Sequence, residues 1–137
     1  MPLVVDPSAV FGIVMDDEAA DYAELVLAEV GQNGGLVPSI FWYEVRNVLV
    51  VNERSGRIST SKADAFLASL AELPIEFEAL PSELGVLGLA RGHRLTVYDA
   101  AYLELASRTA APLATLDEAL RGAARAVGVH LFSADVP

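Results

Sequence analysis

The sequence predicts an α/β fold, specifically a three-layer α/β/α sandwich with a short, mostly parallel central sheet. Short apolar runs occur at Leu3–Val5, Leu36–Val37 and Leu113–Leu116, and each suits a strand buried on both faces. Helical patterns separate these runs, and parallel strands need such crossover helices between them. A chain of 137 residues that is 53% hydrophobic can bury one substantial core, so we expect a single domain over residues 1–137.

The first half of the chain predicts three helices after its opening strand. Residues 17–32 place apolar side chains at helical spacing between acidic ones, which is typical of an amphipathic surface helix. Ser39 is positioned to cap a helix over Ile40–Arg54. Ser61 and Asp64 have the spacing of a capping box for a further helix, so the second and third helices should form a hairpin.

The second half predicts an edge strand, three helices and a final strand. Ile75–Ala79 alternates apolar and acidic residues, and Pro81–Ala90 has proline at its first helical position. Val97–Ser107 is a strongly apolar helix. A helix over Asp117–Val127 and a last strand at Val129–Phe132 follow the apolar run at Leu113.

Charge and composition limit the possible functions. The net charge is −10, with only nine lysine and arginine residues, which argues against broad electrostatic capture of nucleic acid, so any such substrate must meet local basic groups. The absence of cysteine excludes disulfides and thiolate zinc sites and suits a cytoplasmic protein. The longest apolar stretch, Leu36–Val51, is interrupted by charged residues, so we expect no membrane span.

Four carboxylates occur in apolar settings: Asp6, Glu44, Asp99 and Asp117. Asp6 and Asp117 each follow an apolar run, and ligands of open α/β sheets bind beyond the carboxyl ends of the strands. Each acid also has a purely structural interpretation. Asp6 and Asp117 have the positions of helix N-caps, although Thr115 and Glu118 could cap the last helix instead, and Glu44 could pair with an arginine.

These acids together predict a site for a hard divalent cation. Carboxylates that are brought together raise one another's pKa and oppose folding, and a bound cation relieves that repulsion. An oxygen-only ligand set suits Mg²⁺ or Mn²⁺ better than Zn²⁺. Because such an ion can orient water and neutralise the charge that grows on a phosphodiester, we expect hydrolysis of that bond.

Four segments of the chain resemble the PIN-domain ribonucleases, and within them the VapC-type toxins of bacterial type II toxin–antitoxin systems. They are Val5–Ser8, Trp42–Leu49, Tyr98–Ala106 and Leu113–Leu120, and together they span nearly the whole chain. The resemblance implies a PIN-like fold and endonucleolytic cleavage of RNA that depends on Mg²⁺, with Mn²⁺ as a substitute, at the four acids. It further implies a homodimer inhibited by a cognate antitoxin protein, with Ser8, Asn47 and Thr115 as supporting polar residues.

Two rival functions remain open from the sequence. A phosphoacceptor receiver-like domain also gathers carboxylates around Mg²⁺, but it needs a well-placed lysine, and the single lysine is Lys62 in a predicted surface helix. A non-catalytic PIN-fold binding module would keep the fold without the activity. We expect a partner chain on the apolar face of the helix pair over residues 40–73, and Tyr98 and Tyr102 either in the core or stacked on a base.

Overall fold

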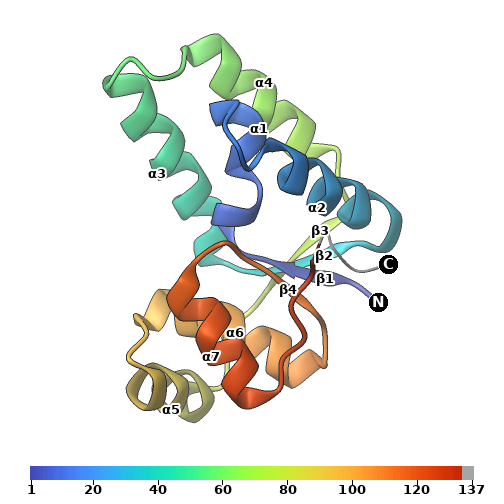
Figure 1. The fold of residues 1–137 in the computed structure, drawn as a ribbon, viewed down its shortest axis with the longest axis vertical. Helices are drawn as coiled ribbons and strands as arrows, with labels where there is room; N and C mark the ends of the chain where they lie inside the picture. Colours follow the sequence, from blue (N-terminus) through green and yellow to red (C-terminus); the bar gives the residue numbers. More distant parts are fainter. Residues whose placement is uncertain (134–137) are drawn as a thin grey trace.

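The computed structural model describes residues 1–133. Within them, four strands form one parallel sheet in the order β3-β2-β1-β4 (Figure 1). The strands are β1 (Leu3–Val5), β2 (Gly35–Pro38), β3 (Ile75–Glu78) and β4 (Leu113–Ala114). Every residue of β1, β2 and β4 is buried, whereas the edge strand β3 is partly exposed, as the sequence patterns predict.

Helices cover both faces of this sheet. They are α1 (Phe11–Met15), α2 (Ala20–Asn33), α3 (Ile40–Arg54), α4 (Thr60–Ala71), α5 (Glu83–His93), α6 (Val97–Thr109) and α7 (Glu118–Val127), with a short 3₁₀ helix η1 at Pro7–Ala9. Figure 1 shows α1 to α4 on one side of the sheet and α5 to α7 on the other, with α3 and α4 as a projecting hairpin. The three-layer α/β/α prediction is therefore confirmed.

The strand order brings two distant parts of the chain together. From β1 the chain crosses to β2 on one side, while β4 pairs with the other side of β1. Val5 lies in register with Ala114, and the Asp6 amide donates to the Ala114 carbonyl at 3.0 Å. A crevice for ligands forms at such a switch point, so the residues that follow β1 and β4 stand where a site is expected.

Several predicted helix starts are wrong, and the caps explain why. Ser59, not Ser61, caps α4, because its extended backbone lets its Oγ accept a hydrogen bond from the Lys62 amide at 3.0 Å. In the same way Ser82 caps α5 by accepting from the Gly85 amide at 3.2 Å, so Pro81 lies before the helix rather than in its first turn. Ser39 precedes α3 without a side-chain capping bond.

Two other elements differ from the prediction. α2 begins at Ala20, three residues later than expected, because α1 and its left-handed terminal residue Asp16 occupy the preceding segment. Within residues 1–133, the predicted last strand at 129–132 is reduced to one parallel bridge between Leu113 and Leu131. A search of these residues found no helix with the length and apolar character to cross a membrane.

Candidate active site

Asp6 lies at the carboxyl end of β1 and is 6% exposed. Its Oδ2 accepts hydrogen bonds from Thr115 Oγ1 at 2.9 Å, from the Ser8 amide at 3.3 Å and from Ser8 Oγ. The bond from the Ser8 amide makes Asp6 the N-cap of η1, so its structural interpretation is correct. The bond from Thr115 also joins this carboxylate to the end of β4, so Asp6 does more than cap η1.

Thr115 and Ser8 connect the ends of the two central strands. Thr115 is fully buried, and its Oγ1 accepts from the Asp117 amide at 3.1 Å while donating to Asp6. Ser8 Oγ lies 3.3 Å from Thr115 Oγ1 and accepts from the Leu116 amide at 2.9 Å. The two predicted supporting hydroxyls thus fix the β4–α7 connection against the start of η1.

Asp117 caps α7 itself. Its Oδ1 accepts from the Leu120 amide at 2.8 Å, so the prediction that Thr115 and Glu118 might cap this helix is wrong. The hydroxyl of Thr115 instead accepts from the amide of Asp117 and donates to Asp6. One side-chain oxygen of Asp117 serves the helix, which leaves the other for a different role.

Glu44 reaches the site from α3 and is held by a tyrosine. Tyr102, fully buried on α6, donates its Oη hydrogen to Glu44 Oε1 at 2.5 Å. The alternative of an arginine partner is wrong, because the two ion pairs within residues 1–133 join Arg57 to Asp17 and Arg108 to Glu104. A neutral donor leaves the negative charge of Glu44 in place.

Asp99 stands in the first turn of α6. Its amide donates to Thr96 Oγ1 at 3.0 Å, so Thr96 is the N-cap of this helix. Its carboxylate is half-buried, and a hydrogen bond with the Thr96 side chain lowers its pKa against the larger, opposing effect of burial. A carboxylate has two oxygens, so Asp99 can still offer one to a cation or a water.

The acids act on one another electrostatically. Burial is the largest cause that raises the pKa of Asp6, Glu44 and Asp99 above the usual carboxyl range. The charge of Glu44 raises the pKa of Asp6 further, that of Asp99 raises the pKa of Glu44, and those of Asp6 and Asp117 raise the pKa of Asp99. Acids from η1, α3, α6 and α7 therefore share one electrostatic environment.

The chemistry of this donor set fits a hard cation. All the side chains are oxygen ligands, and their mutual repulsion is what a divalent ion relieves. Within residues 1–133, no three histidine, cysteine, aspartate or glutamate side chains are grouped so that they could hold a metal ion between them. A Mg²⁺ site in a protein can be built from only one or two carboxylates, because the ion keeps several waters.

Sequence reasoning assigned Asn47 to the site and missed two other residues. Asn47 lies exposed on α3, one turn after Glu44. The sequence pattern predicts Tyr102 only as a core residue or a stacking ring, although its position three residues after Asp99 puts both side chains on one helix face. Arg121, whose Nη1 donates to the Thr115 carbonyl at 3.1 Å, lies four residues after the cap residue Asp117, in the first turns of α7.

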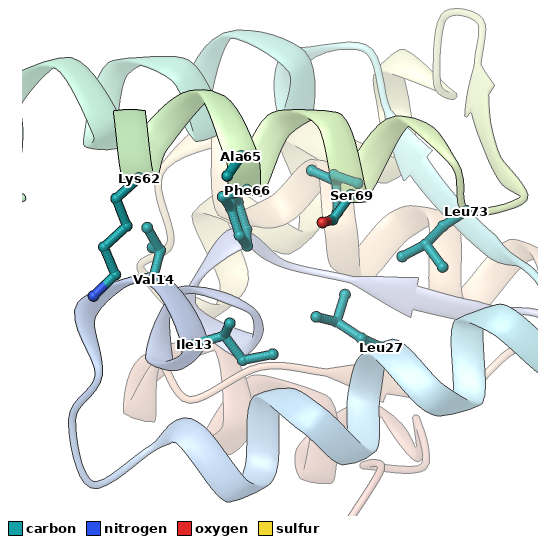
Figure 2. A pocket seen from close by; sticks show the side chains of 9 residues that line it. Ile13, Val14, Leu27, Lys62, Ala65, Phe66, Ser69 and Leu73 are labelled. Atoms are coloured by element: carbon teal, nitrogen blue, oxygen red, sulfur yellow. The ribbon is translucent and has the colours of Figure 1, made fainter. Parts of the chain in front are cut away.

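An apolar cavity of about 430 Å³ lies away from the acids, between α1, α2 and α4. Figure 2 shows Leu27 of α2 facing Phe66 and Leu73 across it, with the Lys62 ammonium at one end. None of the four acids lines this cavity. It is therefore a separate feature that belongs to the apolar side of the helix pair.

Known proteins resemble this chain over most of its length. Ribonuclease VapC3 of Pyrobaculum aerophilum is 36% identical over 126 residues, which cover 88% of this chain and 92% of that protein. Ribonuclease VapC3 of Mycobacterium tuberculosis is 31% identical over 129 residues, 92% of each chain. The crystal structure of PAE2754 from Pyrobaculum aerophilum shares the fold, with a TM-score of 0.63 and 23% identity over 90% of this chain and 86% of that one. The PIN domain profile matches residues 3–126, and this chain accordingly belongs to the PIN domain family.

Proposed function

We propose that this protein is an endoribonuclease that depends on Mg²⁺ or Mn²⁺, with Asp6, Glu44, Asp99 and Asp117 holding the ion directly or through water. The observation that carries the proposal is geometric: Asp6 and Asp117 follow the adjacent parallel strands β1 and β4, and Thr115 links the two strand ends through its bond to Asp6. The charges of Asp6 and Asp117 also raise the pKa of Asp99, so these acids lie near one another. The ribonuclease names of relatives that align along most of the chain support the same substrate class.

The residues around the acids would orient them for this chemistry. Ser8 and Thr115 donate to Asp6 Oδ2 and leave its Oδ1 for a ligand. Tyr102 orients Glu44 from the buried side of α6. When bound, the ion would supply a positioned water and neutralise charge on the scissile phosphodiester.

We further propose that the protein is the toxin of a type II toxin–antitoxin pair that acts as a homodimer in the cytoplasm. VapC-named relatives support this role. The apolar cavity beside α4 suits an apolar segment of an antitoxin, and the Lys62 ammonium at its end suits an acidic residue of that segment (Figure 2). The half-exposed Trp42 ring on α3 supports a homodimer contact outside the cavity.

Substitution of Asp6 tests the proposed activity. The purified protein should cleave single-stranded RNA only when Mg²⁺ or Mn²⁺ is added, and Asp6→Asn should abolish that cleavage while its circular dichroism stays unchanged. Asp64→Asn is a matched control, because Asp64 is an exposed acid on α4 that lines no part of the site. Equal rates for wild type and Asp6→Asn would remove Asp6 from the mechanism.

Two further assays distinguish the rival functions from the proposed nuclease. Lys62 lies at the apolar cavity and not among the acids, which counts against a receiver-like domain. A stable phosphoryl-aspartate formed from a small phosphodonor would nevertheless favour that domain. Calorimetric titration with Mn²⁺ that detects no binding at millimolar metal would favour a non-catalytic PIN-fold binding module.

A further inference from the structure

Arg121 carries a positive charge beside the candidate site. Its Nη1 donates to the Thr115 carbonyl at 3.1 Å, and the hydroxyl of the same threonine donates to Asp6. Within residues 1–133 no carboxylate lies within ion-pair distance of the guanidinium. An arginine offers five donor hydrogens, so most of its donors remain for a ligand. In a chain of net charge −10, an unpaired guanidinium in this place needs an explanation.

A cavity of about 380 Å³ opens at Arg121. It lies between the first turn of α2, the β4–α7 connection and the segment after α7, and it is lined by Glu18, Ala19, Tyr22, Leu116, Arg121, Phe132 and Ser133. Its walls are partly rigid, because Tyr22 Oη donates to the Phe132 carbonyl at 2.9 Å and the two rings lie 6.2 Å apart. The cavity thus combines one cation with apolar and aromatic walls.

The β4–α7 connection is a shared wall between this cavity and the acids. Leu116 lines the cavity, and the neighbouring residues Thr115 and Asp117 belong to the acid site. Tyr22 responds to both sides: burial raises its pKa most, the Arg121 charge lowers it, and the Asp6 charge raises it. An RNA strand bound across the four acids can therefore continue into this cavity.

We propose that Arg121 and this cavity form a subsite for the RNA backbone, in which the guanidinium binds a phosphodiester adjacent to the one that is cleaved. Arginine matches phosphate with two parallel hydrogen bonds, and Leu116 and Phe132 provide an apolar wall for the attached nucleoside. The subsite deepens the proposed ribonuclease function and rests on it. Arg121 is a positioning residue, because it would hold the strand rather than touch the reacting atoms.

Glu18 provides a second test of the subsite, because its charge should affect RNA binding in the opposite direction to that of Arg121. Its carboxylate lines the same cavity and repels a phosphate there, although it forms no ion pair with Arg121. Neutralising Glu18 should therefore strengthen RNA binding, whereas neutralising Arg121 should weaken it. A purely structural Arg121, needed only to hold the Thr115 carbonyl, predicts no effect of Glu18 on RNA.

The test compares Arg121→Met, Arg121→Lys, Glu18→Gln and Arg125→Met with wild type. Arg125→Met is the matched control, since Arg125 is an exposed arginine in the last turn of the same helix and lines no part of this cavity. Fluorescence anisotropy measures the Kd for a labelled 12-nucleotide single-stranded RNA at 50 to 200 mM NaCl without added metal. Cleavage kinetics with Mg²⁺ give kcat and KM for the same RNA.

Arg121→Met should raise Kd and KM about tenfold, as the loss of a charge-assisted hydrogen bond does, with a much smaller change in kcat. The slope of log affinity against log salt should fall by about 0.7, the value for one contact to single-stranded nucleic acid. Arg121→Lys should restore the salt slope, Glu18→Gln should lower Kd, and Arg125→Met should behave like wild type. If Arg121→Met matches Arg125→Met in both Kd and salt slope, the subsite does not exist.

The two proposals fail in different ways. If wild type cleaves RNA and Arg121→Met changes neither binding nor KM, the subsite is wrong and the ribonuclease function stands. If wild type binds RNA in an Arg121-dependent manner but never cleaves it with any metal, the subsite stands and the nuclease function is wrong. If wild type neither binds nor cleaves RNA, both are wrong.

Discussion

Tyr102 Oη donates a hydrogen bond to Glu44 Oε1 at 2.5 Å and so joins the core of α6 to the candidate site on α3. The tyrosine is fully buried, whereas Glu44 lies at the margin of the site. This bond lowers the pKa of Glu44 against the larger opposing effect of burial. The core of the protein thus helps to keep a site carboxylate charged.

Tyr102→Phe tests that relationship. It removes one hydroxyl and keeps the ring, so the free energy of unfolding should fall by about 1.5 to 3 kcal/mol, as for a lost bond to a charged group. Cleavage should fall as well, since Glu44 loses both its orientation and the bond that lowers its pKa. Urea denaturation and RNA cleavage measure the two effects. Tyr98→Phe, on an exposed ring of the same helix, should leave stability unchanged, and an equal loss there would contradict the assignment.

Thr115→Val tests the link between the strand ends. Valine has the shape of threonine but no hydroxyl, so Asp6 loses a donor and the Asp117 amide loses an acceptor in a fully buried place. The free energy of unfolding should fall by about 1 to 3 kcal/mol, the range for an unsatisfied buried group. Thr115→Ser should recover most of it in the same denaturation experiment. A valine variant as stable as wild type would show that the hydroxyl does not contribute to the free energy of unfolding.

The sequence was sufficient for the layers of the fold and for most helices. Fully apolar runs such as Leu3–Val5 indicate buried parallel strands, and the observed bounds of α3 match the predicted 40–54. Local start signals were less reliable: Ser61 and Asp64 have the spacing of a capping box, but the extended backbone at Ser59 makes that residue the cap of α4. Chain spacing alone cannot reveal that choice.

The candidate site was predictable in its acids but not in their partners. Asp6 and Asp117 follow the two adjacent strands, and parallel strands bring such positions together. The donor to Glu44 comes from a residue 58 positions away, on a helix that packs on β1 and β2. Such long-range pairs depend on how the helices pack, and no local sequence motif at Tyr102 or Arg121 predicts its partner.

Asp99→Asn should stabilise the metal-free protein at pH 7. Asp99 has a raised pKa through burial and the charges of Asp6 and Asp117, so its ionised form opposes folding. Removing the charge should raise the melting temperature by about 2 °C, a small effect because the side chain is half-exposed and screened. Millimolar Mg²⁺ should stabilise wild type more than the variant. A variant that melts below wild type without metal would contradict the repulsion.

The same acids predict how stability depends on pH. The folded pKa values of Asp6, Glu44 and Asp99 lie above their unfolded values, so the folded state binds more protons in the window above about pH 4. The contribution of these acids to the free energy of unfolding therefore falls as the pH rises through the raised pKa values. Bound Mg²⁺ should reverse this trend, so its effect on the melting temperature should be larger at pH 7 than at pH 5. Thermal scans with and without Mg²⁺ measure this difference in melting temperature. An equal metal effect at pH 5 and pH 7 would show that Mg²⁺ does not bind these carboxylates.

Substitutions of Asp117 can distinguish its role as a helix cap from its proposed role in the acid site. It caps α7 through Oδ1, and its charge raises the pKa of Asp99. Because asparagine caps a helix as well as aspartate, Asp117→Asn should keep the stability of wild type while cleavage is lost. Asp117→Ala should lose cleavage and also about 1 kcal/mol of unfolding free energy, since the Leu120 amide then lacks an acceptor. An asparagine variant that cleaves RNA at the wild-type rate would leave Asp117 with the cap as its whole function, and the site would then consist of three acids.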